Sequence, residues 1–276
     1  MNQLYESTGI SKQAVHQYAR RQALFDRQLM ELMSEADDIR RDHPGCGVEK
    51  MYYTLNPDFI GRDRFVATFM QLGYRLKRKK NYRRTTIAGK IYYPNKIKGI
   101  KITAPSVVWQ SDITYYRVGD KFYYAVFIID VYTKKIVGYE VSDHMRATAN
   151  LKALRMALKD NKAPKIHHSD RGSQYTFKSY TELLKSHTTT ISMALSAQDN
   201  AYAERINRTI KEEYLDHWKP QTFSQLKSQV NKAVKNYNNK RSHNHLEKRN
   251  PEEFINYWST LKPEERPIIT IFDNEN

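Results

Sequence analysis

The sequence predicts a mixed α/β fold over its last two thirds and an all-α region before it. After position 106, runs rich in β-branched and aromatic residues indicate five strands, and amphipathic segments indicate three helices. The resulting order, β-β-β-α-β-α-β-α, is typical of a mixed sheet with helices packed on its faces. The first third instead places its apolar residues at helical spacing. A chain of 276 residues favours two domains over one.

The charge of the chain is strongly positive and unevenly distributed. Lys and Arg number 46 against 30 Asp and Glu, and positions 1–101 alone hold 20 basic and 10 acidic residues. This balance favours a polyanionic partner, because Lys and Arg contacts to phosphates release condensed counterions. On charge alone, a ribosomal protein or a merely soluble basic protein remains the alternative. The single cysteine, Cys46, excludes an internal disulfide and a cysteine-based zinc site.

The hydropathy pattern gives no sign of a membrane protein. No apolar run reaches the ~18 residues that a spanning helix requires. The polar start of the chain, Met1 to Leu4, is unlike a signal peptide. We therefore expect no membrane partner and a cytoplasmic, reducing location.

The first twenty residues predict a helix, a tight turn at Gly9 and a second helix capped by Ser11. Ala14, Val15 and Tyr18 form the apolar stripe of the second helix. This is the layout of a helix-turn-helix, whose second helix could enter a major groove. An ordinary helical hairpin is the alternative. The outward-facing candidates for DNA contact are Lys12, Gln13, His16 and Arg20.

Three more helices are predicted in the first third, at 24–41, 48–55 and 62–72. Pro and two Gly residues within 43–47 break the chain between the first and second of them. A small helical bundle with a solvated basic face is the alternative to a DNA-binding region.

Residues 75–101 contain eleven basic residues and no acidic one. Such a segment repels itself, so we expect it to lack a packed core and to hold the domain junction. Its tyrosines could stack on bases, although a simple charged linker is equally consistent with the composition. The candidate DNA contacts here are Lys77, Arg78, Lys79, Lys80, Arg83 and Arg84. The expected regions are a helical DNA-binding region at 1–80, a basic linker at 81–101, an α/β domain at 102–262 and a tail at 263–276.

The α/β region opens with three consecutive strands. The first is predicted at 107–116, and the second, at 122–132, is nearly all apolar and therefore buried on both faces. Gly119 and Asp120 form a turn that makes these two strands a hairpin. The remaining predicted elements are a strand at 135–142, a helix at 148–159, a strand at 164–169, a helix at 177–187, a strand at 190–195 and a helix at 200–218.

Three carboxylates stand where these elements end or turn. Asp112 lies on the first strand, Asp170 just past the fourth, and Glu204 one turn into the last helix. Magnesium prefers oxygen ligands and keeps several waters, so a few carboxylates plus substrate phosphates suit it. Two such ions ~4 Å apart can activate an attacking oxygen and stabilise a leaving one. Position alone does not single out these three among 30 acidic residues, since Asp130 also ends a strand.

The residues around the three carboxylates resemble insertion-sequence transposases of the OrfB type, whose catalytic core is similar to retroviral integrase. The matching segments are Trp-Gln-Ser-Asp-Ile-Thr at 109–114, His-Ser-Asp-Arg-Gly-Ser-Gln-Tyr at 168–175 and Asn-Ala-Tyr-Ala-Glu at 200–204. Lys211 matches the basic residue that the family carries seven positions after its glutamate. The segments 39–47 and 237–251 resemble the family's helix-turn-helix region and closing segment. The resemblance covers roughly residues 5–258.

The resemblance implies an RNase H-like fold with a five-stranded mixed sheet. It implies that Asp112, Asp170 and Glu204 are the catalytic residues and the ligands of two Mg²⁺ (or Mn²⁺) ions. The family usually separates the last two ligands by thirty-five residues, whereas 33 separate them here. We expect the shortening to fall in a loop at 192–199, where two residues can be lost without moving the helix far.

The same resemblance implies cleavage at element ends followed by strand transfer. Arg208 and Lys211 share a helix face with Glu204 and are predicted to contact DNA. A surface ion pair between Glu204 and Arg208, and a merely solvated Lys211, are the alternatives.

The implied partners are terminal inverted repeats, target DNA and further copies of the chain, at the bacterial nucleoid. The family also allows a longer fusion made by frameshifting from an upstream reading frame. A nuclease of the same fold without joining activity and a non-catalytic DNA-binding regulator are the rival functions.

Overall fold

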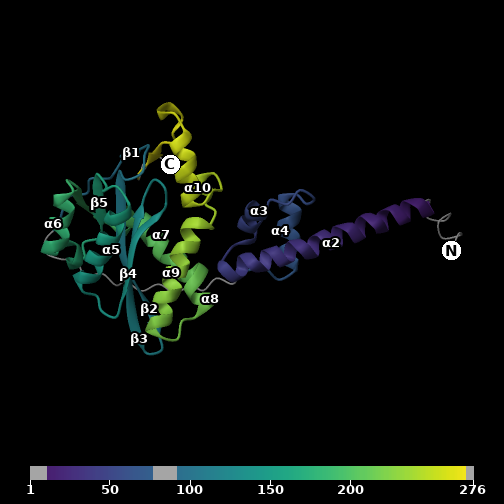
Figure 1. Cartoon of the computed structure of the whole chain (residues 1–276), viewed down its shortest axis with the longest axis horizontal. Helices are drawn as coiled ribbons and strands as arrows, with labels where there is room; N and C mark the ends of the chain where they lie inside the picture. The colour runs from purple at the N-terminus through teal and green to yellow at the C-terminus, as the bar shows by residue number, and fades with distance from the viewer. Residues whose placement is uncertain (1–10, 77–91, 272–276) are drawn as a thin grey trace. The chain divides into compact units, whose positions relative to one another are not determined.

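The computed structural model contains two compact units, Met1–Arg78 and Lys79–Asn276. The structure describes residues 11–76 and 92–271. Helices alone make up the described part of the first unit, whereas the second unit combines a sheet with helices (Figure 1). None of the described helices has both the length and the apolar character needed to cross a membrane.

The first unit is built on one long helix, α2 (Lys12–Asp42), followed by α3 (Val48–Leu55) and α4 (Arg62–Gln71). The Ser11 side chain caps α2 by accepting a hydrogen bond from the Ala14 backbone N–H at 3.1 Å. The second half of α2 shares a core with α3 and α4. Its fully or largely buried members include Leu32, Ala36, Met51, Phe65 and Phe69.

The expected division of residues 12–41 into two helices is wrong. α2 runs without interruption, because residues 12–42 contain neither Gly nor Pro to end a helix. Val15 and Tyr18, expected to form a buried stripe, are 38% and 63% exposed. The predicted first helix and its turn at Gly9 lie outside the described residues. The bounds of α3 and α4 agree with the prediction to within one residue.

A five-stranded mixed sheet forms the centre of the second unit, as predicted (Figure 1). Its strands are β2 (Val108–Val118), β3 (Lys121–Asp130), β4 (Ile136–Ser142), β5 (Ile166–Ser169) and β6 (Thr190–Met193). In the order β4-β3-β2-β5-β6, the first three strands are antiparallel, whereas β5 runs parallel to β2 and β6 parallel to β5. Gly119 has a φ of +58° in the β2–β3 turn, a conformation that glycine adopts readily.

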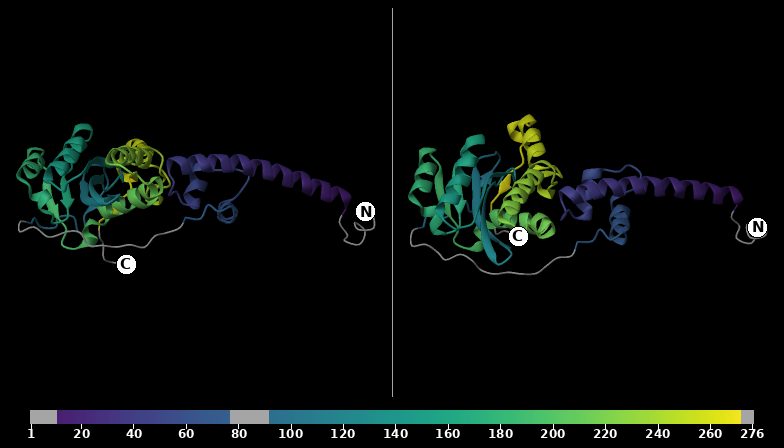
Figure 2. Two further views of the ribbon diagram at one scale, coloured as in Figure 1. Left: turned by 90° about the horizontal axis from the view of Figure 1, so that it is seen from below. Right: turned by 60° about the horizontal axis from the view of Figure 1, so that its bottom comes forward.

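Helices cover both faces of this sheet (Figures 1 and 2). They are α5 (Ala147–Asp160) and α6 (Lys178–Ser186) on one face and α7 (Ala201–Ile210) and α9 (Phe223–Asn239) on the other. Strand β3 contributes to both cores. Val126 and Ile128 pack with α5, while Phe127 and Ile129 pack with α7 and α9. Alternate side chains of a strand point to opposite faces, which explains why β3 is apolar over its buried length.

The predicted helix at 200–218 is confirmed as one helical segment with an irregular middle. α7 continues through a π-helical turn at Lys211–Leu215 into α8 (Asp216–Trp218). Two later helices, α9 and α10 (Pro251–Thr260), were not predicted. The capping box of Asn250 and Glu253 and the Pro at the first position of α10 explain why that helix begins there.

The expectation that residues 75–101 lack a packed core is wrong for the last part of that segment. β1 (Lys101–Ile102) pairs antiparallel with β7 (Ile269–Thr270), which lies in the predicted tail. Ile97 and Ile271 are fully buried and belong to one apolar cluster with Phe254 of α10. The basic charge of the segment concealed apolar residues whose packing partners come from the other end of the chain.

Candidate active site

Two of the three predicted carboxylates stand side by side where the parallel pairing of β2 with β5 ends. Ser111 of β2 and Ser169 of β5 form the last paired position, so Asp112 and Asp170 are each the next residue. Beyond this pair, β2 continues along β3 only. In open α/β sheets, functional sites typically form at the carboxyl ends of strands where neighbouring connections diverge.

Asp112 lies half-buried on the central strand, facing α7. Its Oδ2 accepts a hydrogen bond of 2.7 Å from Nδ2 of Asn207. Burial, followed by the negative charges of Asp170 and Glu204, raises the pKa of Asp112 well above its usual range. The hydrogen bonds from Ile113 and Asn207 oppose this rise. A carboxylate in this setting favours a nearby cation.

Asp170 occupies the turn that follows β5. Its Oδ1 accepts a hydrogen bond from the Gly172 backbone N–H at 3.0 Å. Arg171 holds the same turn to the chain after β6 by donating from Nε to the Ala194 carbonyl at 3.0 Å. The buried His168 ring lies 2.8 Å from the Ser192 hydroxyl, joining β5 to β6. These contacts fix the strand end that carries Asp170.

Glu204 projects from the first turn of α7 and is exposed. The carboxyl group is still partly shielded from water, and this partial burial raises the pKa of Glu204. The positive charge of Arg208 lowers that pKa, and the negative charge of Asp170 raises it. Asp170 thus acts electrostatically on both Asp112 and Glu204. The fold has brought three carboxylates that are far apart in the sequence within electrostatic reach of one another.

The shortened connection before Glu204 is a compact turn. Residues Ala197–Asn200 form a 3-10 helix, η2, whose start is closed by reciprocal capping between Ser196 and Asp199. The Asp199 carboxylate also accepts a hydrogen bond from the Leu195 backbone N–H at 2.8 Å. Because α7 follows directly, a connection of this length still places Glu204 close enough to Asp170 for the charge of Asp170 to raise the pKa of Glu204.

Lys211 begins the π-helical turn and is half-buried. Burial lowers the pKa of its ammonium group, while the charges of Asp216 and Asp112 raise it. Its Nζ lies 5.5 Å from the centroid of the Tyr115 ring. Lys211 is therefore near Asp112, whereas Arg208 is exposed one turn earlier.

The carboxylates do not yet form a finished metal site. Among the described residues, no three His, Cys, Asp or Glu side chains are arranged so that they could hold a metal ion. The available donors are nevertheless all oxygens. They include Oδ1 of Asn207, which is buried and accepts no hydrogen bond within the described structure. An oxygen-only set fits a hard divalent cation such as Mg²⁺.

The remaining predicted DNA contacts fall in the first unit and the basic segment. Lys12, Gln13, His16 and Arg20 are all exposed on the first turns of α2. The other predicted contacts, Lys77, Arg78, Lys79, Lys80, Arg83 and Arg84, lie outside the described residues.

Asp130, which also ends a strand, has a structural role. It is buried and accepts hydrogen bonds from the backbone N–H groups of Ser106 and Thr133 and from Nε1 of Trp109. Its carboxylate oxygens are therefore occupied by donors from the neighbouring turns and from β2. Position in the sequence did not distinguish it from Asp112, but its partners do.

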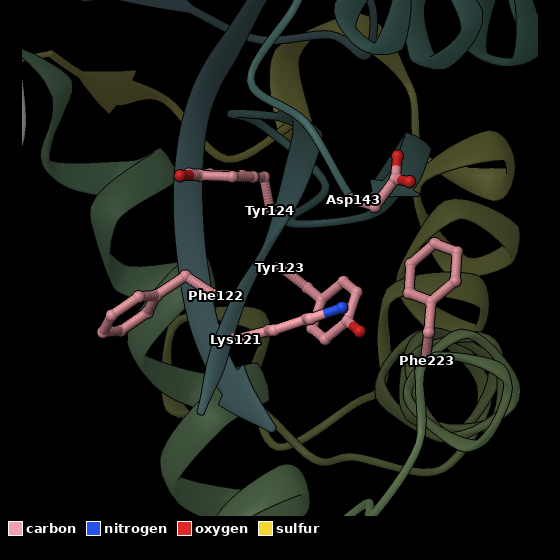
Figure 3. Close-up of a pocket in the computed structure, with 6 residues that line it drawn as sticks. All are labelled: Lys121, Phe122, Tyr123, Tyr124, Asp143 and Phe223. Carbon is pink, nitrogen blue, oxygen red and sulfur yellow. The ribbon is translucent and has the colours of Figure 1, made fainter. Parts of the chain in front are cut away.

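The surface hollow at the far end of the β2–β3 hairpin is separate from the carboxylates. It is lined by Lys121, Phe122, Tyr123, Tyr124, Asp143 and Phe223 (Figure 3). The Tyr123 ring stacks on Phe223 of α9 with centroids 4.8 Å apart. None of the three carboxylates lines this hollow.

Asn207 is the site residue that sequence reasoning missed. It stands three positions after Glu204 on α7, and residues three apart share a helix face. That spacing was the available signal. The sequence did not show that the facing strand would place Asp112 opposite it.

Comparison with known proteins identifies the class that this fold and site define. Two integrase core domain families match the chain, one at residues 102–197 and the other at 187–251. A chain of the simian T-cell lymphotropic virus intasome, solved with the PP2A regulatory subunit B56 gamma, resembles it with a TM-score of 0.50. That match has 14% identity and covers 66% of this chain and 64% of the viral one. The fold is the RNase H-like fold of integrase catalytic cores.

Proteins related in sequence identify the family more narrowly than the fold does. The 31 kDa protein of insertion element IS600 from Shigella sonnei is 33% identical over 207 residues, covering 72% of this chain and 76% of the relative. The transposase of IS904 from Lactococcus lactis is 33% identical over 172 residues, covering 60% and 68%. The chain belongs to the insertion-sequence transposases with an integrase-like core. It is a DNA transposase, an enzyme of the polynucleotidyl transferase class.

Proposed function

We propose that Asp112, Asp170 and Glu204 are the catalytic carboxylates of this transposase and hold two divalent ions, Mg²⁺ or Mn²⁺. The observation that carries the proposal is the register of β2 and β5, which sets Asp112 and Asp170 side by side, together with α7, whose Asn207 bonds Asp112 and whose first turn carries Glu204. Three carboxylates held this close repel one another, and divalent cations relieve that repulsion. Glu204 is exposed, so its side chain is free to turn toward the aspartates when metal and DNA bind.

The reaction is phosphoryl transfer without a covalent protein intermediate. Water first hydrolyses one strand at the end of the element and leaves a 3′-hydroxyl. That hydroxyl then attacks a second phosphodiester in line. The new bond joins it to the 5′-phosphate of the attacked strand, and the 3′-bridging oxygen of that strand leaves as a 3′-hydroxyl. When bound, the metal ions would activate the attacking oxygen and stabilise the leaving one.

The residues around the carboxylates position them and the DNA. Asn207 holds one oxygen of Asp112, and the Gly172 backbone N–H holds one oxygen of Asp170, so both carboxylates keep a defined orientation. Lys211 carries a positive charge beside Asp112, where it can bind a phosphate of the reacting strand. Exposed Arg208 can bind a neighbouring phosphate.

The substrate is DNA carrying the terminal inverted repeats, together with target DNA. The net charge of +16 supports a polyanionic substrate, and the exposed polar residues on α2 offer contacts to it. We propose that Lys12, Gln13, His16 and Arg20, with the basic residues at 77–84, bind the element ends. The intasome named for the structural neighbour supports action as a multimer on DNA. Fusion to the product of an upstream reading frame is compatible with this function.

The test is incubation of the protein with labelled element-end DNA and Mg²⁺ or Mn²⁺. We expect both a nicked product and a joined product. Asp112→Asn, Asp170→Asn and Glu204→Gln should each lower both activities by at least about 10³-fold while DNA binding persists. Asp143→Asn is the matched control, because Asp143 follows β4 and lines the hollow to which none of the three carboxylates contributes, and it should retain activity.

Two outcomes would change the assignment. Nicking without any joined product would favour a nuclease of the same fold. Full activity in Asp170→Asn would remove the proposed site, because the charge that couples the three carboxyl groups would be gone.

A further inference from the structure

The helix that carries Glu204 begins without the cap that its sequence offers. Asn200 occupies the N-cap position of α7, but its side chain caps no N–H of the helix. Asn is among the residues that usually fill this role, because its oxygen can satisfy the free N–H groups of the first turn. Another residue must therefore meet those groups.

Gln110 on β2 supplies the cap from outside the helix. Its Oε1 accepts hydrogen bonds from the backbone N–H groups of Tyr202 at 3.1 Å and Ala203 at 3.3 Å. These are the second and third residues of α7, the positions that an N-cap side chain ordinarily serves. Gln110 Nε2 donates to the Asp199 carbonyl at 3.2 Å, so both ends of the amide are bonded.

Asn200, which occupies the N-cap position, instead hydrogen-bonds to strand β2. Asn200 Nδ2 donates to the Ser111 carbonyl at 3.1 Å. Gln110 and Ser111 are completely buried, and Asn200 is 2% exposed. Neighbouring residues of β2 thus exchange side-chain hydrogen bonds with the start of α7, in a region from which water is excluded.

We propose that Gln110 is a positioning residue that sets the distance between Asp112 and Glu204. Gln110 lies two residues before Asp112, and Ala203, whose N–H it binds, directly precedes Glu204. The Gln110 amide therefore links β2 to α7 at a point two residues from Asp112 and one residue from Glu204. This inference rests on the proposed function, in which both carboxylates are catalytic. A misplacement of about 1 Å can lower the rate of a positioned reaction by about 10²-fold.

The first measurement is structural and independent of activity. Gln110→Met keeps the length and burial of the side chain but can neither accept nor donate these hydrogen bonds. Hydrogen exchange of the full-length protein should show faster exchange at the Tyr202 and Ala203 amides, with α9 unchanged. Gln229→Met is the matched control, because Gln229 lies on α9 and its Oε1 accepts no hydrogen bond in the described structure. It should leave exchange in α7 unchanged.

The second measurement is kinetic. In single-turnover strand transfer with a pre-cut element end, Gln110→Met should lower kcat by about tenfold to 10²-fold and change KM for DNA by less than about twofold. Gln110→Glu retains the acceptor oxygen, so it should protect the two amides better than the Met variant does. It also keeps the proposal testable if the Met variant fails to fold.

Several outcomes would overturn the proposal. Unchanged exchange at Tyr202 and Ala203 in both variants would show that Gln110 does not anchor α7. Faster exchange with an unaltered kcat would show that the anchor has no part in the reaction. Full activity in Glu204→Gln would instead refute the catalytic assignment, and the exchange experiment would still report on the anchor.

Discussion

Asn207 of α7 donates a hydrogen bond of 2.7 Å to the carboxylate of Asp112 on the central strand. The helix that carries Glu204 therefore also orients Asp112, so the positions of both carboxylates depend on α7. Nδ2 of Asn207 is the donor, and the amide oxygen Oδ1 is buried and accepts no hydrogen bond in the described structure.

Asn207→Leu should impair catalysis more than folding. The substitution keeps the size of the side chain but removes the donor, so the Asp112 carboxylate loses its fixed orientation. Removing one oriented donor at an active site typically costs about 10²-fold to 10³-fold in rate. We expect such a loss in strand transfer, measured with pre-cut ends. Asn239→Leu on α9 is the control, because the only described hydrogen bond of the Asn239 side chain goes to the Lys235 carbonyl of its own helix. A rate within twofold of wild type would contradict a positioning role for Asn207.

Lys211→Ala should weaken DNA binding in a manner that depends on salt. If Lys211 binds one phosphate, the slope of log affinity against log salt should fall in magnitude by about one. The control is Lys159→Ala in the last turn of α5, on the opposite face of the sheet. Binding titrations at several salt concentrations measure the slope. An identical slope in the two variants would argue against a phosphate contact.

The pair of Arg241 and Glu213 should be strongly coupled in stability. Arg241 donates from Nε and from a terminal nitrogen to the two Glu213 oxygens, each at 2.7 Å, and its side chain is 6% exposed. Removing one partner of a buried pair leaves an uncompensated charge and costs about 3–5 kcal/mol. We expect a loss of that size in Arg241→Met, measured by denaturant unfolding.

The double variant Arg241→Met with Glu213→Leu should recover much of that loss, because neither charge is then left alone. The more exposed pair of Arg249 and Glu247 is the control, and Arg249→Ala should cost no more than about 1 kcal/mol. Equal losses in the single and double variants would show that packing, and not the charge pair, dominates at Arg241.

Lys134 should make stability depend on pH in the alkaline range. It is buried, with Nζ donating to the Val131 carbonyl at 2.6 Å and lying 4.0 Å from the centroid of the Tyr202 ring. Burial lowers the pKa of Lys134 from 10.5 to about 7, against the opposing charge of Asp130. Between these values the unfolded chain binds more protons at this site, so stability should rise with pH.

Lys134→Met removes that contribution. The variant should gain stability relative to wild type below pH 7, and its advantage should shrink as the pH rises toward 10.5. Unfolding measured at pH 6.5 and pH 9.5 tests the sign, with exposed Lys159→Met as control. An advantage that does not depend on pH would indicate an ordinary lysine pKa.

Gly138→Ala should destabilise the second unit. A Cβ at Gly138 of β4 would lie 2.3 Å from the Ala153 carbonyl oxygen and 2.8 Å from the Ala157 Cβ of α5. The backbone contact cannot be relieved by turning a side chain, so the helix must move. Overpacking of this kind costs about 1–3 kcal/mol. Gly47→Ala is the control, because a Cβ there meets nothing within 4 Å, and thermal unfolding should show a smaller shift for it.

The strands and the first helices of the second unit could be predicted because their residue patterns are local. The apolar run of β3 and the turn at Gly119 are visible in the sequence, and both occur as predicted. Residues 92–101 were misjudged because their charge is local, whereas Ile97 shares a core with Phe254 and Ile271 near the other end of the chain. The division of residues 12–41 into two helices was an avoidable error, because no residue at the predicted boundary breaks a helix.

The sequence alone determined which carboxylates are the candidate ligands and the kind of chemistry to expect, because the motifs around Asp112, Asp170 and Glu204 are short and local. Only the tertiary structure decided what holds them together. The pairing of Ser111 with Ser169 sets the two aspartates side by side, and contacts from Gln110 and Asn207 join the central strand to α7. Register and side-chain hydrogen bonds between distant segments depend on how the whole chain packs, and no local pattern records them.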